Sequence, residues 1–491
     1  MRILLIDIDS LRPDHLSCYG YHRQTSRNID SVAERGVRFT NYYATDTPCL
    51  PSRTAFFSGL FGLITGVVNH GGKFADLPMQ GESRKFRAQF AENTLGRVLT
   101  RAGYHTASIS SFPQRHSAYQ IWQGFSETHD PGKHGADIAD DVQPFVKRWL
   151  DQNGKRDNWF LHVNYWDPHT PYDVPFEYGD PFADDPIDPW LTQEIIDAQV
   201  VSYGPHSANE LPGYVPKFNG NWLRGVTAVK DLADAKAHID AYDTGIHYVD
   251  AFIGRILAQL DTLGIVDETA IIITADHGEN HGELNVWGDH QTADQITNRI
   301  PLIIHWPGIT DQQAGTACDG LHYHIDFTAT LAELIGAPQP DQWSGQSFMP
   351  AFAGEKTGRD YLVLGHGAWS CQRSVRWDNW LLIRTYHTGL KDFPAYMLFD
   401  IANDPHETTN LAQQRPDILG QGLQLIDEWL TEQMRHAWRG DPIWGVVQEG
   451  GGLHANTNGP QWATYLQRLR DTGRGHHADW LAEHGGRPRQ E

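Results

Sequence analysis

Short apolar runs alternate with amphipathic stretches over most of this chain. The first run covers residues 2–8, and similar runs lie at 37–39, 104–109, 159–165 and 270–275. Such runs are typical of strands that are buried on both faces of a parallel sheet. Apolar residues from Ile239 to Leu260 recur instead at steps of three and four, which predicts one face of a long helix that ends at Gly264.

The alternation of strands with helices predicts a fold class. Shorter helices are expected from Ile29 to Gly36 and from Thr94 to Ala102. The pattern favours an α/β protein with a large, mostly parallel sheet between two layers of helices. The stretch from Asp173 to Leu232 departs from it, because it is rich in Pro, Gly, Asp and aromatic residues and has little periodicity. We interpret this stretch as a long excursion near the active-site edge of the sheet.

After about Gly365 the pattern changes. Two strand-like segments and a helix are expected at 374–384, 396–400 and 416–432. The strands look antiparallel. We therefore predict two domains, a large α/β domain over residues 1–365 and a smaller α+β subdomain over residues 366–491, in which a short antiparallel sheet packs against one helix.

Length and composition indicate a large globular protein. The chain has 491 residues, of which 40% are hydrophobic, so a sizeable core can form. No apolar run approaches the ~20 residues that span a bilayer, and no signal-peptide pattern follows Met1. Four cysteines in so long a chain are no disulfide framework: Cys18, Cys49, Cys318 and Cys371. These features lead us to expect a cytoplasmic protein.

The formal net charge of −22 at pH 7 bears on the partners. Nucleic acids and anionic membrane surfaces select basic faces, so we expect neither as a partner. An anionic substrate would need a pocket of the opposite local charge. A metal ion and a few Arg, Lys and His side chains can provide one.

Candidate chemistry lies where two of the predicted strands end. Asp7 and Asp9 come at the end of the first strand, and the strand at 270–275 leads into Asp276-His277-Gly278-Glu279. Ligands of open α/β sheets bind at the carboxyl ends of the strands. Together with the segment Cys49-Leu50-Pro51-Ser52-Arg53, these strand ends look like parts of one site.

The Cys49 segment resembles the maturation motif of the type I sulfatases, which are formylglycine-dependent enzymes of the alkaline phosphatase superfamily. The order of the motifs is also similar, with an acid after the first strand, then the Cys motif, then Asp276-His277-Gly278. The resemblance covers Met1 to about Ala412. It implies an alkaline-phosphatase-like fold and oxidation of Cys49 to formylglycine. In the hydrated aldehyde one hydroxyl can attack sulfur, and the other can later expel sulfate.

The resemblance also implies a divalent cation held by Asp9, Asp276, His277 and the modified Cys49. Oxygen-rich ligation favours a hard ion, Ca²⁺ first and Mg²⁺ as an alternative, while the His leaves room for Mn²⁺. This chain departs from the commonest family pattern at Ser10, where many members have a second Asp.

Two charged residues near this set have separate interpretations. Asp7 lies two residues before Asp9, on the same side of the strand, and is either a further ligand or a structural carboxylate. Arg53 lies four residues after Cys49, and the resemblance implies that it holds the hydrated aldehyde and the sulfate.

Histidines supply the remaining candidates. The resemblance implies that His169, in Pro168-His169-Thr170-Pro171, protonates the leaving alcohol, although it could also only shape its loop. A lysine usual in the family is missing near 110–116, where His116 or Arg115 could replace it. Asp289 stands where another lysine is common, which leaves His290 to touch sulfate.

A last candidate for substrate binding is Asn69. It occupies the region where the related phosphonate monoester hydrolases place a substrate-binding Asn.

These features favour a sulfatase that hydrolyses a sulfate ester of a sugar or another small organic alcohol. Its partner would be a formylglycine-generating or anaerobic maturation enzyme. The first alternative is a phosphonate monoester or phosphodiester hydrolase of the same superfamily. The second is a non-catalytic binder of sulfated glycans. The sequence does not indicate an oligomeric state.

Overall fold

The computed structural model describes residues 1–77, 92–211, 224–437, 439–453 and 460–489. Within them, the larger sheet has eight strands in the order β12-β2-β11-β8-β1-β7-β5-β6. These strands are β1 (Arg2–Ile8), β2 (Val37–Phe39), β5 (His105–Ile109), β6 (Glu127–His129), β7 (Trp159–Tyr165), β8 (Thr269–Thr274), β11 (Leu302–His305) and β12 (Ala317–Cys318). Neighbouring strands are parallel except where β11 pairs with β2 and β8. The prediction of a mostly parallel sheet is confirmed.

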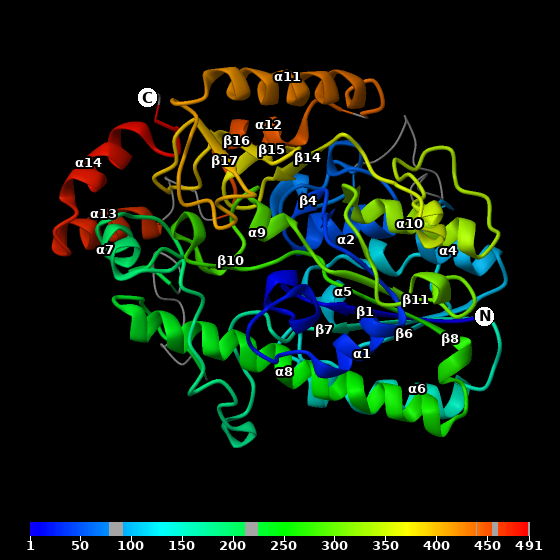
Figure 1. Ribbon diagram of the computed structural model, residues 1–491. Coiled ribbons are helices and arrows are strands. Elements are labelled where there is room, and N and C mark those ends of the chain that lie inside the picture. The colour runs from blue at the N-terminus through cyan, green and yellow to red at the C-terminus, as the bar shows by residue number, and fades with distance from the viewer. Residues whose placement is uncertain (78–91, 212–223, 438, 454–459, 490–491) are drawn as a thin grey trace.

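Helices cover both faces of this sheet (Figure 1). One layer holds α1 (Arg27–Arg35), α6 (Ala139–Asn153) and α8 (Leu232–Thr262), and the other holds α2 (Cys49–Ser58), α4 (Leu95–Arg101) and α10 (His324–Leu334). The predicted apolar face of the long helix is the buried face of α8. The strand β1 lies between β7 and β8, and all its residues are buried, which explains its nearly continuous apolar sequence.

A second sheet belongs to the C-terminal part of the chain. Its strands lie in the order β17-β16-β15-β14-β4, with β14 (Tyr361–His366), β15 (Cys371–Trp377), β16 (Trp380–His387), β17 (Tyr396–Asp400) and β4 (Asp46–Thr47). The strands from β14 to β17 are antiparallel, and α11 (Pro416–Gln433) packs on them as expected. The predicted division between residues 365 and 366 falls within β14, and it stays a prediction.

The short strand β4 connects this second sheet to the start of α2. It pairs with β14, so that Asp46 lies beside Gly365. The Asp46 carboxylate also accepts a hydrogen bond from Gly62 N at 2.7 Å. Since Pro48 and Cys49 follow β4 directly, the C-terminal sheet fixes how the chain approaches α2.

Some elements have no counterpart in the sequence patterns. The excursion from Asp173 to Leu232, of which residues 212–223 lie outside the described part, contains α7 (Gln193–Val201). The C-terminal tail forms α12 (Pro442–Gln448), α13 (Pro460–Asp471) and α14 (Gly475–His484). The remaining short elements are β3 (Tyr42–Tyr43), α3 (Gly62–Thr65), α5 (Phe112–Arg115), β9 (Asn280–His281), β10 (Trp287–Asp289), α9 (Gln295–Asn298) and β13 (His322–Tyr323). Among the described residues, no helix is long and apolar enough to cross a membrane.

Candidate active site

The carboxyl ends of β1 and β8 meet the first turn of α2. Asp9 follows β1, Asp276 follows β8, and Cys49 is the first residue of α2. All three side chains are buried. The structure therefore brings the two acidic strand ends and the Cys segment into one place, at the edge of the sheet where open α/β proteins bind their ligands.

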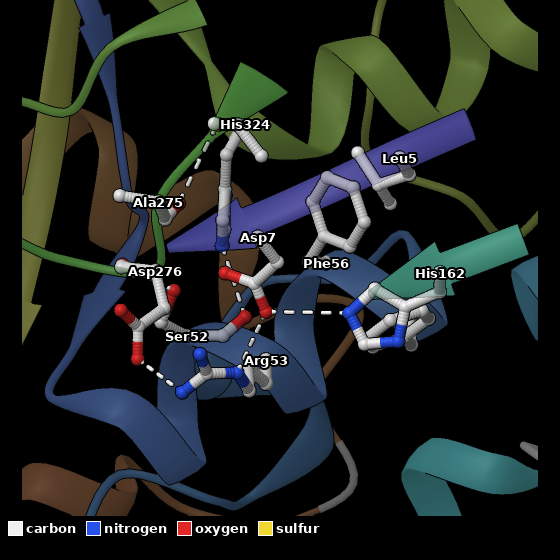
Figure 2. Close-up of a pocket in the computed structure, with 11 residues that line it drawn as sticks. Leu5, Asp7, Ser52, Arg53, Phe56, His162, Ala275, Asp276 and His324 are labelled. Atoms are coloured by element: carbon white, nitrogen blue, oxygen red, sulfur yellow. Dashed lines mark hydrogen bonds and ion pairs between the residues drawn. The ribbon is translucent and has the colours of Figure 1, made fainter. Parts of the chain in front are cut away.

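Arg53 lies between carboxylates contributed by both strands, and Figure 2 shows it between Asp7 and Asp276. Its Nε donates to Asp7 Oδ2 at 3.0 Å, and its Nη1 donates to Asp9 Oδ2 at 3.0 Å and also to Asp276. Three carboxylates thus share one guanidinium, which leaves negative charge that a divalent cation could balance.

Hydrogen bonds from side chains to backbone carbonyls hold the first turns of α2 in place. The Ser52 hydroxyl donates to the carbonyl of Asp276 at 2.6 Å, and His324 Nε2 lies 3.0 Å from the carbonyl of Ser52. The ring of Phe112 packs against Arg53, with its centroid 4.4 Å from Cζ. Because Cys49 and Arg53 are one helical turn apart, this anchoring sets both side chains at once.

Asp9, Asp276 and His277 form a group that could hold a metal ion. Their potential ligand atoms all lie within 4.8 Å of one another. The Nδ1 atom of His277 lies 2.8 Å from the Gly278 carbonyl and so carries the proton. Its buried Nε2 lies 3.4 Å from Asp276 Oδ2 and has no hydrogen-bond partner among the residues that the structure describes. Two carboxylates and one free imidazole nitrogen fit a hard divalent ion.

The protonation of this group agrees with ion binding. Burial lowers the pKa of His277 well below its ordinary value, so the ring is neutral and can act as a ligand. Burial raises the pKa of Asp276 well above its ordinary value despite the opposing effect of Arg53, and the carboxylates of Asp9 and Asp7 add to the rise. A bound cation would relieve this crowding of negative charge.

The Cys49 side chain faces a histidine from a neighbouring loop. Its Sγ lies 3.3 Å from His70 Nε2, and the same nitrogen accepts a hydrogen bond from Leu50 N at 3.3 Å. Burial, followed by the charges of Asp9 and Asp276, raises the pKa of the Cys49 thiol well above its ordinary value. The unmodified side chain is therefore a thiol, which is a weak nucleophile.

His290 packs over the metal-binding group. Its ring centroid lies 4.0 Å from that of His277 and 5.6 Å from that of His169. Burial by itself would lower the pKa of His290, but the carboxylates of Asp289 and Glu279 outweigh burial and raise the pKa to about 9. The ring is therefore positively charged at neutral pH and can attract an anionic group.

The other predicted histidines line the same place. The Nδ1 atom of His169 contacts the Thr170 carbonyl, and burial lowers the pKa of this ring. The His116 ring lies 5.0 Å from His70 between centroids, and its buried Nε2 has no hydrogen-bond partner within the described parts of the chain. Burial, followed by the charge of Arg115, lowers the pKa of His116 to about 3.

The two other candidates, Arg115 and Asn69, make contacts with residues near them in the fold. The Arg115 guanidinium lies over the Trp166 ring, 5.0 Å from its centroid, and is near the carbonyls of His134 and Gly135. Asn69 is buried, and its Oδ1 accepts a hydrogen bond from His70 N at 2.7 Å. Asn69 thus orients the loop that carries His70.

The sequence did not identify the neighbours of several site residues. Asp7 is the partner of Arg53, and His162 Nε2 lies 3.4 Å from Asp7 Oδ2, the same oxygen that accepts from Arg53 Nε. The sequence assigned no role to His70, which lies directly after Asn69. Glu279 lies 3.8 Å from His290 Nδ1. The position of Glu279 directly after Asp276-His277-Gly278 was the signal that could have pointed to it.

Two family models together match most of the chain. The sulfatase family model matches residues 2–337. A second model, the C-terminal part of N-sulphoglucosamine sulphohydrolase, matches residues 282–424. The two matches overlap and together reach from β1 into α11.

Curated relatives are similar over most of the chain. An arylsulfatase of Clostridium perfringens is 25% identical over 466 residues, which cover 83% of this chain and 89% of that protein. Iduronate 2-sulfatase of Mus musculus is 25% identical over 426 residues, which cover 71% of each protein.

Solved structures share the fold. One, in complex with its substrate D-glucosamine-2-N,6-O-disulfate, has a TM-score of 0.71 and 19% identity, and covers 90% of this chain and 99% of its own. The phosphonate monoester hydrolase of Agrobacterium radiobacter has a TM-score of 0.67 and 21% identity, and covers 89% of this chain and 96% of its own. The fold is therefore that of the alkaline-phosphatase-like sulfatases.

Proposed function

This chain belongs to the sulfatase family, as a type I sulfatase of the alkaline phosphatase superfamily and hence a sulfuric ester hydrolase, and from this premise we propose that it hydrolyses a sulfate ester of a sugar. The observation that carries the proposal is the meeting of Cys49 and Arg53 with the buried group of Asp9, Asp276 and His277. This reaction needs a precursor of the nucleophile, which is Cys49, a fixed positive charge, which is the Arg53 guanidinium, and a group that binds a metal ion.

We propose that Asp9, Asp276 and His277 hold one divalent cation, with Cys49 as a further ligand after oxidation to formylglycine. Ca²⁺ is favoured by the two carboxylates, with Mg²⁺ and Mn²⁺ as alternatives. When bound, the ion supplies positive charge that polarises the sulfate ester and lowers the cost of placing an anion among carboxylates. The formylglycine hydrate supplies two hydroxyls on one carbon, one for attack on sulfur and one for release of sulfate.

The remaining residues bind the anion and move protons. Arg53 is held in place by Asp7 and Asp9, so its charge faces the sulfate without reorganisation. The positively charged His290 is proposed to attract a sulfate oxygen, and His116 is proposed to bind sulfate as well. His169 Nδ1 contacts the Thr170 carbonyl and carries one ring proton, so the proton for the leaving alcohol comes from Nε2 of the doubly protonated ring. Because burial lowers the pKa of His169, Nε2 first takes up a proton, and the negative charge of a bound sulfate ester would favour that uptake.

Relatives support a sugar as the leaving alcohol. An N-acetylglucosamine-6-O-sulfatase of Bacteroides thetaiotaomicron is 24% identical over 482 residues, covering 83% of this chain. The decisive test is a screen of sulfated mono- and disaccharides with matured protein, followed by kcat/KM for the best substrate. A complete lack of sulfate release from every sulfated sugar and aryl sulfate would refute the proposal.

A phosphonate monoester or phosphodiester hydrolase is the second candidate, because solved structures of two phosphonate monoester hydrolases share the fold. The ratio of kcat/KM for an aryl sulfate to that for an aryl phosphonate ester decides between the two. A ratio above one supports the sulfatase. Turnover of either compound excludes a protein that only binds sulfated glycans.

The proposed partner in maturation is a formylglycine-generating or anaerobic maturation enzyme.

A further inference from the structure

A second group of potential metal ligands lies beside the first and shares one residue with it. The Sγ of Cys49 and ring nitrogens of His277 and His290 lie within 4.8 Å of one another, and all three residues are buried. The first group offers two carboxylates and His277. The second offers sulfur and nitrogen only, so the two groups suit different ions.

The ligand types of the second group favour zinc. Zn²⁺ binds Cys and His in tetrahedral sites, whereas Ca²⁺ takes six to eight oxygen ligands. Tetrahedral bonds of about 2.0–2.3 Å keep the ligand atoms roughly 3.3–3.8 Å apart, so shifts on the order of 1 Å would close the site. His70 Nε2 already lies 3.3 Å from Cys49 Sγ and is placed to be a fourth ligand.

Contacts around the two imidazoles leave nitrogens available. His277 Nδ1 faces the Gly278 carbonyl. In the described part of the chain, neither the buried Nε2 of His277 nor the buried Nδ1 of His290 has a hydrogen-bond partner. Carboxylates flank both nitrogens of His290, Glu279 3.8 Å from Nδ1 and Asp289 3.6 Å from Nε2. A ligating histidine whose second nitrogen faces a carboxylate is the usual arrangement at zinc sites.

We propose that the unmodified thiol form of this protein binds one Zn²⁺ through Cys49, His277 and His290, and that this zinc excludes the hard cation of the matured site. Zinc displaces the thiol proton of Cys49 and, from the charged form of His290, the proton of the ligating nitrogen, and both protons go to solvent while the second ring nitrogen of His290 keeps its proton. Exclusion follows because His277 belongs to both groups and its Nδ1 faces the Gly278 carbonyl, which leaves one nitrogen, Nε2, for an ion. Oxidation of Cys49 by a maturation enzyme removes the sulfur ligand. His277 can then bind the hard cation together with Asp9 and Asp276.

The zinc site itself does not depend on sulfate ester hydrolysis, and only the contrast with the matured form rests on the proposed function. Protein is produced without a maturation enzyme, and mass spectrometry verifies that Cys49 is a thiol. After chelator treatment, zinc affinity is measured in competition with a chromophoric chelator, and Co²⁺ is added separately to record its spectrum. We expect one zinc per chain and a thiolate-to-cobalt charge-transfer band in the wild-type protein.

Variants assign the ligands. Cys49→Ala should abolish the cobalt band, and both Cys49→Ala and His290→Ala should weaken zinc binding by at least about tenfold, because even outer-shell changes at zinc sites cost 10–100-fold. Asp9→Asn should change the affinity for zinc far less, because Asp9 is not in the second group. The matched control is Cys18→Ala, which removes a partly buried thiol from another part of the chain.

Two results would overturn the proposal. One is a wild-type cobalt spectrum without a thiolate band, which needs no variant and so does not depend on how the variants fold. The other is zinc affinity that Asp9→Asn removes and Cys49→Ala leaves unchanged, since zinc would then occupy the carboxylate group. Because metal binding is the readout, failure of this proposal is distinct from a lack of sulfatase turnover in matured protein.

Discussion

The carboxylate of Asp7 accepts a hydrogen bond from Arg53 Nε at 3.0 Å, and this pair links β1 to the second turn of α2. Arg53 uses a different nitrogen, Nη1, for Asp9 and Asp276. Asp7 thus fixes the plane of the guanidinium, while the other two carboxylates belong to the metal-binding group. Among the described residues, Asp7 is absent from both groups of potential metal ligands.

Asp7→Asn therefore separates two roles that the sequence left open. If Asp7 positions Arg53, the variant should lose roughly 10–100-fold in kcat/KM on a sulfate ester while metal affinity changes less than about tenfold. If Asp7 is a ligand, metal affinity should fall along with activity. Calorimetric metal titration and steady-state kinetics on one preparation distinguish the two. Asp151→Asn, at an exposed position of α6, is the control.

Maturation of Cys49 has a direct chemical signature. Mass spectrometry of active protein should find the Cys49 peptide as the aldehyde or its hydrate. Cys49→Ala should abolish turnover, and Cys49→Ser should lose nearly all of it, since a single hydroxyl cannot release sulfate by collapsing to an aldehyde. Full activity with an unmodified thiol at Cys49 contradicts the proposed nucleophile.

Removal of the metal should affect both activity and stability. Chelation should abolish turnover, and Asp276→Ala should weaken metal binding by at least about tenfold. A ligand that binds only the folded state at 100 times its Kd adds about 2.7 kcal/mol to the free energy of unfolding, and the variant should lose most of this gain at the same metal concentration. Denaturation with and without metal measures it. Unchanged activity in Asp276→Ala would remove Asp276 from the site.

His169 can be tested through the leaving group. A general acid matters most when the leaving alcohol is poor, as in a sugar, and least when it is good, as in a nitrophenol. His169→Ala should therefore slow a sugar sulfate by about 10²–10⁴-fold and an activated aryl sulfate far less. Values of kcat/KM for one substrate of each kind decide the matter. Equal losses would mean that His169 only shapes its loop, and would direct attention to His116 and His290.

Lys391 should give folding stability an unusual dependence on pH. Its side chain is buried, its Nζ donates to the Asn285 carbonyl at 3.0 Å, and burial lowers its pKa from 10.5 to about 7. The unfolded chain therefore binds more protons than the folded one between about pH 7 and pH 10.5. The charged form of Lys391 therefore lowers the free energy of unfolding, because its ammonium group is buried. This loss of stability is complete below pH 7 and fades as the pH rises toward 10.5, so this residue makes stability increase with pH.

Lys391→Met should remove that loss of stability. At pH 6 the variant should exceed the wild-type protein in free energy of unfolding by roughly 1–3 kcal/mol, and the difference should shrink by pH 10. Urea denaturation at the two pH values measures it. Lys147→Met, at an exposed position, should show no such pH-dependent difference. A difference for Lys391→Met that is the same at both pH values would mean that the amine stays charged in the fold.

Several parts of the fold could be predicted from the sequence because their signals are local. The strands β1, β7 and β8 are buried on both faces, so their apolar runs carry nearly their whole environment. The long helix α8 shows its buried face at helical steps. The helices α7 and α12 are short, with nine and seven residues, and α7 buries only Ile196 fully, so no comparable pattern marks them.

The same distinction applies to the candidate site. The sequence by itself determined which side chains stand at the strand ends, since Asp9, Asp276 and Cys49 are adjacent to readable elements or motifs. Only the tertiary structure decided which partner each one meets. Asp7 pairs with Arg53 across 46 positions, and Cys49 meets His70 across 21. The physical reason is that hydrophobic periodicity records burial along one element, whereas the pairing of charges and donors depends on how separate elements pack.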